Sequence, residues 1–236
     1  PATEPGIKGS ARINVGNKDT AQKAVRVSLK NDKGYALVNL SDYSTDGDNT
    51  ALRGEEKDGY SNKTSLLKFT ADINKQFTAE ALFRRSDNEV QTDPQDFAFP
   101  ATQTQGFVID GDDFSNTKQQ YGGFLLSHRD ESLPLESNIR YSQAKTRSNF
   151  FENGVRTLGN RATRENLIWQ SKLQLDEIRN DQWISLVIQL ERLEFKNFSE
   201  NYPAANYEET LKETGVALSY KLSPAKSTDL SLSLRR

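Results

Sequence analysis

Apolar and polar residues alternate along most of the chain, and this period of two constrains the fold more than any other feature. In residues 77–85, FTAEALFRR, the odd positions carry mainly phenylalanine and alanine, while most even positions are polar and Leu82 is the exception. Successive side chains of an extended strand point to opposite faces, so this pattern is typical of a strand with one apolar face. No segment shows a convincing helical period of 3.6. The sequence therefore predicts an all-β protein.

The same alternation recurs in eleven segments, which predicts an antiparallel up-and-down meander of about eleven strands. The expected strands cover residues 7–15, 23–30, 34–43, 65–73, 77–85, 120–128, 135–143, 166–175, 183–195, 214–222 and 229–236. Most are longer than the usual ~5 to 6 residues and suit tilted strands that cross a bilayer. Residues 1–236 are expected to form one partial transmembrane β-barrel domain, and both termini are expected to be cuts in a longer protein.

The connections between these segments alternate in length. Short polar turns are expected at 31–34, 74–76, 129–134, 176–181 and 223–229. Longer loops are expected at 44–62, 86–117, 146–163 and 197–209, with 17–22 as the short member of this second set. A meander places every second connection at the same end, so the chain has a short-turn end and a long-loop end. This arrangement is typical of outer-membrane barrels, whereas a Greek-key sandwich has no reason to keep it.

Composition excludes several classes of protein. The mean hydropathy is -0.77, and no run approaches the ~20 apolar residues of a membrane-spanning helix. Lys and Arg total 31 against 33 Asp and Glu, so no overall positive field attracts nucleic acid. There is no cysteine, His128 is the single histidine, and no nucleophile elbow, HExxH or phosphate-binding glycine loop occurs. We therefore predict neither an enzyme nor a nucleic-acid-binding protein.

Three segments carry a resemblance to a known family. They are the entry segment 1–20, PATEPGIKGSARINVGNKDT; the loop 45–62 with its Asp46-Gly47 and Asp58-Gly59-Tyr60; and the strand, turn and strand of 213–236. Together they resemble the N-terminal half of the barrel of TonB-dependent outer-membrane receptors. Barrels of this family have 22 strands around a plug domain. The plug, the TonB box and the C-terminal strands of the family are not among these 236 residues.

The resemblance implies a function and a location. It implies a receptor in the outer membrane of a Gram-negative bacterium, surrounded by lipid, which actively transports a metal chelate such as a ferric siderophore or haem. The long extracellular loops would bind the ligand, and the TonB complex would supply energy through a plug domain. The apolar faces would then contact lipid and the polar faces would line the lumen, where Leu82 would pack against the plug. Two alternatives stay open: a soluble β-rich ligand- or carbohydrate-binding module, and a passive porin-like channel.

One long loop contains candidate metal ligands. Asp110, Asp112 and Asp113 lie close together in IDGDDFSNTK, with Asn116 nearby. Calcium prefers such oxygen ligands, although Asp-Gly-Asp is also common in ordinary turns. We therefore predict a possible calcium site in an extracellular loop and no other cofactor.

Aromatic residues in the same loop are candidate ligand contacts. Phe97 and Phe99 lie in TDPQDFAFP, between acidic residues. Rigid aromatic side chains on a loop are suited to recognition. The alternative is that both phenylalanines pack the loop against its neighbours.

A second candidate group lies in residues 146–163. It combines aromatic and cationic side chains that would attract an anionic ferric chelate, and its members are Phe150, Phe151, Arg156 and Arg161. The alternative is an ordinary solvated loop.

Overall fold

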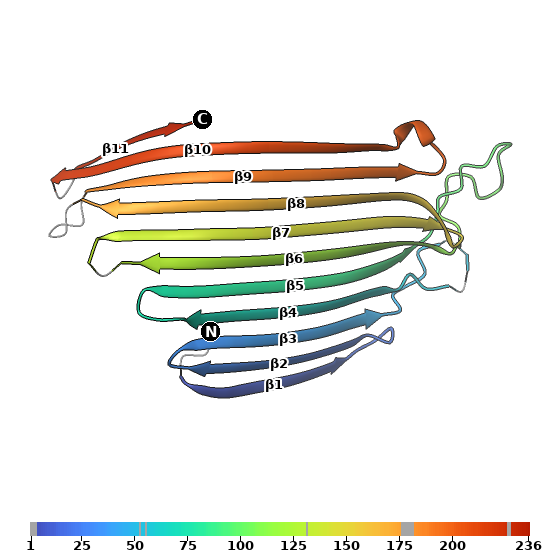
Figure 1. The fold of residues 1–236 in the computed structure, drawn as a ribbon. Coiled ribbons are helices and arrows are strands. Elements are labelled where there is room, and N and C mark those ends of the chain that lie inside the picture. The colour runs from blue at the N-terminus through green and yellow to red at the C-terminus, as the bar shows by residue number, and fades with distance from the viewer. Residues whose placement is uncertain (1–3, 52, 55, 131, 176–181, 226–227) are drawn as a thin grey trace.

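The chain forms one antiparallel β-sheet of eleven strands in sequence order (Figure 1). The computed structural model describes residues 4–51, 53–54, 56–130, 132–175, 182–225 and 228–236. The strands are β1 (Gly6–Val15), β2 (Ala21–Asn31), β3 (Gly34–Thr45), β4 (Tyr60–Asp72), β5 (Phe77–Thr92), β6 (Asp113–Arg129), β7 (Leu135–Glu152), β8 (Val155–Gln174), β9 (Gln182–Ser199), β10 (Tyr207–Ala225) and β11 (Thr228–Arg235). A short 3-10 helix, η1 (Pro203–Ala205), lies between β9 and β10. The predicted all-β meander of eleven strands is confirmed.

The central strands are longer than predicted. Strands β5 to β10 have 16 to 20 residues each, because the backbone ladder continues beyond the point where apolar alternation ends. Polar and charged residues fill the added length at the long-loop end, so hydropathy alone placed the strand ends too early. The predicted turn at 176–181 lies outside the described residues, as do residue 131 of the turn at 129–134 and residues 226–227 of the turn at 223–229.

The prediction of a long loop at 146–163 is wrong. Strands β7 and β8 continue through this segment and meet at a two-residue turn of Asn153 and Gly154, whose φ angles are 48° and 77°. Both central residues of a type I′ hairpin turn need positive φ, and Asn-Gly is its preferred sequence. That dipeptide was the missed signal. At this end of the sheet, the long connections are 46–59 and 93–112.

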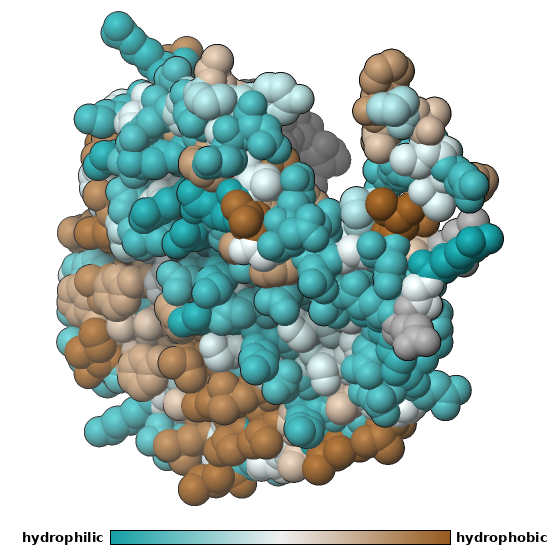
Figure 2. Space-filling model, turned by 90° about the vertical axis from the view of Figure 1, so that its right-hand side faces the viewer, coloured by the Kyte–Doolittle hydropathy of each residue, from teal (hydrophilic) through white to brown (hydrophobic). Residues whose placement is uncertain are grey.

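The two faces of the sheet differ sharply in polarity. Directly opposed residues share a face, and one row across β2 to β9 consists of Leu29, Ala36, Phe69, Ala81, Phe124, Tyr141, Leu167 and Leu190. We call the face that carries this row the apolar face, and the opposite face the polar face. Figure 2 looks onto the loop end and shows hydrophobic residues gathered along the left and lower margins of the molecule.

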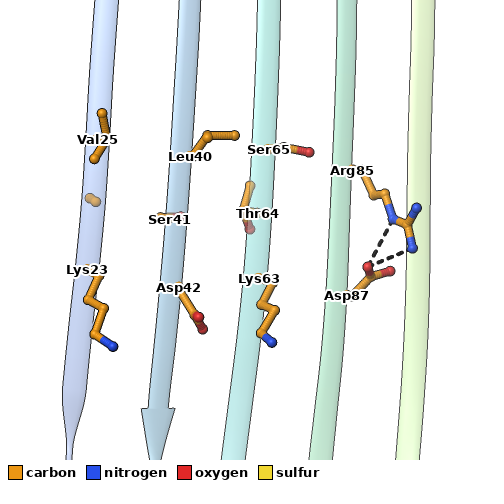
Figure 3. A pocket seen from close by; sticks show the side chains of 11 residues that line it. Lys23, Val25, Leu40, Ser41, Asp42, Lys63, Thr64, Ser65, Arg85 and Asp87 are labelled. Carbon is orange, nitrogen blue, oxygen red and sulfur yellow. Dashed lines mark hydrogen bonds and ion pairs between the residues drawn. The ribbon is translucent and has the colours of Figure 1, made fainter. Parts of the chain in front are cut away.

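The apolar side chains form a band that covers only part of the apolar face. In β9 they are Ile184, Leu186, Ile188 and Leu190, after which the same face carries Arg192 and further charged residues. Figure 3 shows the same boundary on β2 and β3, where Val25 and Leu40 give way to Lys23 and Asp42. Four alternate residues span roughly 20 Å of strand, which matches the apolar belt of about 25 Å in membrane barrels.

No apolar side chain of the described residues is buried, and many are exposed on the apolar face. Figure 1 shows a single layer, with no second sheet or helix packed on either face. No helix among the described residues is long and apolar enough to cross a membrane. A sandwich would bury one face of each sheet against the other, so a β-sandwich module is not what the chain forms.

The two faces give a direct test of stability. If the sequence prediction of a membrane barrel holds, we expect Leu186→Arg to lower the free energy of unfolding from lipid vesicles by about 2 to 4 kcal/mol, because it places a charge within the apolar band. The neighbouring Val187→Arg is the matched control, since Val187 lies on the polar face opposite Gln170 and Ala217. Urea titration of the refolded complete protein measures both. Equal destabilisation by the two substitutions would contradict the assignment of faces.

Candidate binding site at the loop end

The two long loops are joined to each other by side-chain hydrogen bonds. The Asn49 amide donates to the Asp110 carboxylate at 3.1 Å, and the Thr50 hydroxyl oxygen lies 3.2 Å from the Asp93 carboxylate. Asp58 accepts hydrogen bonds from the Thr50 backbone N–H at 2.8 Å and the Thr50 hydroxyl at 2.7 Å. Loops 46–59 and 93–112 therefore form one connected surface at the end of β3, β4, β5 and β6.

Asp96 organises the longer loop around its own side chain. Its carboxylate accepts hydrogen bonds from the hydroxyls of Thr102 and Thr104 and from the Ala98 N–H, the last at 2.8 Å. The backbone is tied as well, because the Asp96 N–H donates to the Phe107 carbonyl at 2.9 Å. The hydrogen bonds from Thr102, Ala98 and Thr104 lower the pKa of Asp96. This buried carboxylate therefore holds residues 96–107 in a defined shape.

This shape presents aromatic side chains to solvent. Phe97 is 74% exposed and Phe99 is 96% exposed, so neither packs the loop against its neighbours. Two further aromatics of the loop end, Phe107 and Tyr202, are also exposed. The sequence analysis did not single out these two, although both lie in predicted connections, where an aromatic residue is itself a signal. Recognition of a ligand by Phe97 and Phe99 stays a prediction.

The role of Asp96 leads to a prediction about loop order. We expect Asp96→Ala to increase hydrogen exchange of residues 96–107 at least about tenfold, because several hydrogen bonds to one carboxylate are lost. Exchange in β5 and β6 should not change. The ionised Asp96 carboxylate stabilises the loop fully at pH values above the pKa of an unfolded aspartate. This stabilisation is lost as the pH falls through the lowered pKa of Asp96. Unchanged protection in the variant would contradict this role.

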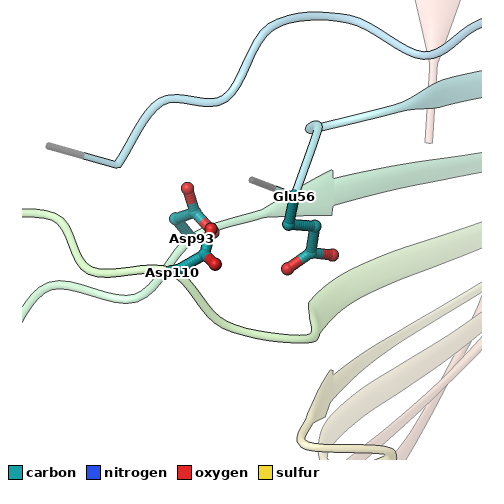
Figure 4. Close-up of side chains that lie close together, drawn as sticks. All are labelled: Glu56, Asp93 and Asp110. Carbon is teal, nitrogen blue, oxygen red and sulfur yellow. The ribbon is translucent and has the colours of Figure 1, made fainter. Parts of the chain in front are cut away.

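An acidic cluster lies where the two loops meet. Carboxylate oxygens of Glu56, Asp93 and Asp110 lie within 4.8 Å of one another (Figure 4). Partial burial raises the pKa of Glu56, and the negative charges of Asp112, Asp110, Asp93 and Asp58 raise it further. The cluster suits a hard cation such as calcium, which takes carboxylate ligands.

The predicted metal ligands are only partly brought together. Asp110 belongs to the cluster, and Asp112 is close enough to affect Glu56 electrostatically. Asp113 is buried and accepts a hydrogen bond from the Asn153 N–H at 3.3 Å, so its carboxylate supports the β7–β8 hairpin. Sequence spacing missed Glu56 because it lies in the other loop. Calcium binding stays a prediction.

The raised pKa of Glu56 gives a test of the calcium prediction. At neutral pH, repulsion among the ionised carboxylates destabilises the cluster, and this cost is lost as pH falls through the raised pKa. We expect calcium to increase hydrogen-exchange protection of residues 46–59 and 93–112 in the unmodified protein. Glu56→Gln should raise protection without calcium and weaken the response to it. Equal protection with and without calcium in the unmodified protein would contradict the prediction.

The second group of predicted ligand contacts is divided by the sheet. Phe150 lies on the polar face, opposite Ser115, whereas Phe151 and Arg161 lie on the apolar face. Phe151 stacks on Phe114 with ring centroids 4.5 Å apart. The Arg156 guanidinium lies 3.9 Å from the centre of the Phe198 ring. All four predicted residues belong to strands β7 and β8, so the structure does not gather them into one loop site.

The fold is similar to that of solved receptor structures. The ferric preacinetobactin receptor BauA of Acinetobacter baumannii matches with a TM-score of 0.56 and 10% sequence identity, over 96% of this chain and 41% of that one. The copper transporter OprC matches with a TM-score of 0.47 and 11% identity, over 98% of this chain and 44% of that one, a likeness too weak to carry an argument. No protein-family model and no curated protein sequence matches the chain.

The likeness to BauA shows that the chain has the fold of part of that structure. The chain spans about two fifths of the length of the receptor structures that it matches. The predicted resemblance to the barrel of an outer-membrane receptor is therefore confirmed at the level of the fold. At 10% identity the likeness does not extend to individual binding residues.

Proposed function

We propose that this chain forms part of the barrel of an outer-membrane receptor that actively transports a metal chelate, such as a ferric siderophore or haem. The apolar face contacts lipid, the polar face lines the barrel interior, and the loop end faces the outside of the cell. Transport is energised by the TonB complex, which acts through a plug domain in the complete protein. The chain has no catalytic role.

The separation of the two faces of a single sheet carries this proposal. Exposing an apolar band of this size to water would raise the free energy of the sheet, because contiguous apolar surface is costly to hydrate. Contact with hydrocarbon removes that cost. It also requires a closed set of strands, because backbone groups at an open sheet edge find no partner in lipid.

The polar face fits a barrel interior. It carries ion pairs such as that of Lys68 and Glu80, 3.9 Å apart, and that of Arg164 and Glu191, 2.9 Å apart. Leu82 lies on this face opposite Lys68 and Gly123, and Leu37 lies on the other side of Lys68 in the same row. A polar interior with a local apolar position suits contact with a plug domain, as predicted for Leu82.

The loop end supplies the ligand contacts. The loop held by Asp96 presents Phe97 and Phe99, and the barrel of similar fold belongs to a receptor for a ferric chelate. Exposed aromatic side chains on an ordered loop bind large ligands at low entropic cost. The connected loops 46–59 and 93–112 therefore form the proposed outer recognition surface.

The recognition surface can be tested by uptake. We expect the double substitution Phe97→Ala and Phe99→Ala in the complete protein to reduce uptake of the active chelate at least about tenfold, since two exposed anchors are lost. The probes are radioiron complexes of catecholate and hydroxamate siderophores, and haem. Phe151→Ala is the control, because Phe151 packs on Phe114 on the apolar face. Equal loss in both variants would contradict the proposal.

The same assay separates active transport from a passive channel. Uptake by the unmodified protein should stop in cells that lack TonB or have lost the proton-motive force. Uptake that continues in those cells would establish a porin-like channel, and the receptor proposal would fail. Absence of the protein from the outer-membrane fraction would reject both.

A further inference from the structure

A row of charged residues crosses the apolar face on the loop side of the apolar band. The register places one member on each strand from β2 to β10: Lys23, Asp42, Lys63, Asp87, Lys118, Arg147, Arg161, Lys196 and Glu208. Each residue lies directly opposite the next, so their side chains are neighbours on one surface. These residues are spread over most of the sequence, and only the strand register brings them into line.

The first part of the row is balanced. Lys23, Asp42, Lys63 and Asp87 alternate in sign across β2 to β5, as Figure 3 shows. Asp87 also accepts a hydrogen bond from Arg85 at 2.9 Å, from the adjacent row. Opposite charges directly across strands stabilise a sheet, so this part of the row needs no external ion.

The second part of the row is cationic throughout. Lys118, Arg147, Arg161 and Lys196 follow one another across β6 to β9. Lys196 pairs with Glu208 at 2.6 Å. Within the described residues, Lys118, Arg147 and Arg161 have no hydrogen-bond or ion-pair partner, and all three are exposed. Like charges directly opposite one another destabilise a sheet, so this arrangement has a cost that an external anion would remove.

Asp87 lies directly opposite Lys118 but is paired with Arg85, and two further acids on this face are also engaged. On the same face, Glu165 accepts a hydrogen bond from Gln143 at 2.6 Å, and Glu194 is paired with Arg192. Lys145, one step nearer the apolar band, is also unpaired within the part of the chain that the structure describes. We call Lys118, Lys145, Arg147 and Arg161 the basic patch. Its positive charge is concentrated across three neighbouring strands, about 10 Å of sheet.

The basic patch adjoins a shallow hollow on the same face. The hollow has a volume of ≈ 140 Å³ and is lined by Gln143, Lys145, Arg161, Thr163 and Arg192, together with the carboxylates of Glu165 and Glu194. A larger hollow, ≈ 370 Å³, lies over the balanced part of the row; it is also lined by charges of both signs and differs in containing the apolar side chains of Val25 and Leu40. The smaller hollow therefore offers Lys145 and Arg161 in a recess whose two carboxylates are engaged by Gln143 and Arg192.

The position of the patch identifies the kind of anion. On β7 the apolar band ends at Tyr141, and Lys145 and Arg147 follow on the same face; on β8 it ends at Leu167, and Arg161 follows. If the apolar band lies in hydrocarbon, as the proposed function requires, the patch lies on the outer side of the hydrocarbon, with Lys145 about 13 Å and Arg147 and Arg161 about 20 Å along the strands beyond Tyr141 and Leu167. Basic residues at this level attract anionic lipid headgroups, and arginine binds phosphate through two parallel hydrogen bonds.

We propose that the basic patch on β6 to β8 binds the phosphate groups of an anionic lipid headgroup. This inference rests on the membrane placement in the proposed function, but not on the transported ligand. The phosphate neutralises Arg147 and Arg161, which lie directly opposite each other, and Lys118 and Lys145 flank it. The balanced half of the row, on β2 to β5, does not bind the lipid.

The test compares two pairs of substitutions in the same row. The complete protein is purified in detergent, stripped of lipid and titrated with phosphatidylglycerol, and bound lipid is counted by native mass spectrometry. We expect Arg147→Gln with Arg161→Gln to weaken binding at least about tenfold, since each basic residue near a headgroup contributes about fivefold. Lys23→Gln with Lys63→Gln removes the same charge from the same face and should leave binding unchanged. Phosphatidylcholine should bind weakly to all three proteins.

Several outcomes would overturn the inference. Equal loss of phosphatidylglycerol in both double variants would show general charge attraction rather than a site. Unchanged binding in the Arg147 and Arg161 variant would place the lipid elsewhere. Displacement of the lipid by inorganic phosphate at equal concentration would show a free-phosphate site. Failure of the proposed function is detected separately. A protein that does not reach the outer membrane contradicts the membrane placement, whatever its lipid binding in detergent.

Discussion

Antiparallel pairing of consecutive strands in nearly unbroken register is the constraint on which the rest of the structure depends. It satisfies the backbone hydrogen bonds of the interior strands from neighbours in the same sheet, while no apolar side chain of the described residues is buried in a core. It also places directly opposed residues on the same face. A residue's odd or even position in its strand therefore decides which surroundings its side chain meets.

The two faces of the sheet carry different kinds of side chain. The apolar face carries a band of hydrophobic side chains near the short turns and charged rows beyond it. The polar face holds compensated charges such as Lys68 and Glu80. At the loop end the sheet geometry no longer applies, and individual carboxylates organise the chain instead. Hydrogen bonds lower the pKa of Asp96 and make it a stable centre of its loop, whereas burial and neighbouring carboxylates raise the pKa of Glu56.

Period-two alternation was enough to predict the strand number, their order and the residues that share the face of Phe77 and Phe83. It failed for the strand ends and for the β7–β8 hairpin, because Asn153 and Gly154 form a two-residue turn within a stretch whose polarity suggested a loop. The cluster of Glu56, Asp93 and Asp110 could not be predicted, since loop conformation brings its members together. The charged row required the register, which no single segment of sequence contains.

The central claim is that the apolar face meets hydrocarbon while the polar face meets water. The most direct measurement is the accessibility of nitroxide spin labels placed singly at residues 184 to 191 of β9 in the complete protein, reconstituted in lipid vesicles. This chain contributes no cysteine of its own, so it adds no competing label site. The account predicts that oxygen collisions dominate at Ile184, Leu186, Ile188 and Leu190, and that collisions with a water-soluble nickel chelate are favoured at the positions between them. A profile without this period of two, or with the opposite phase, would contradict the account.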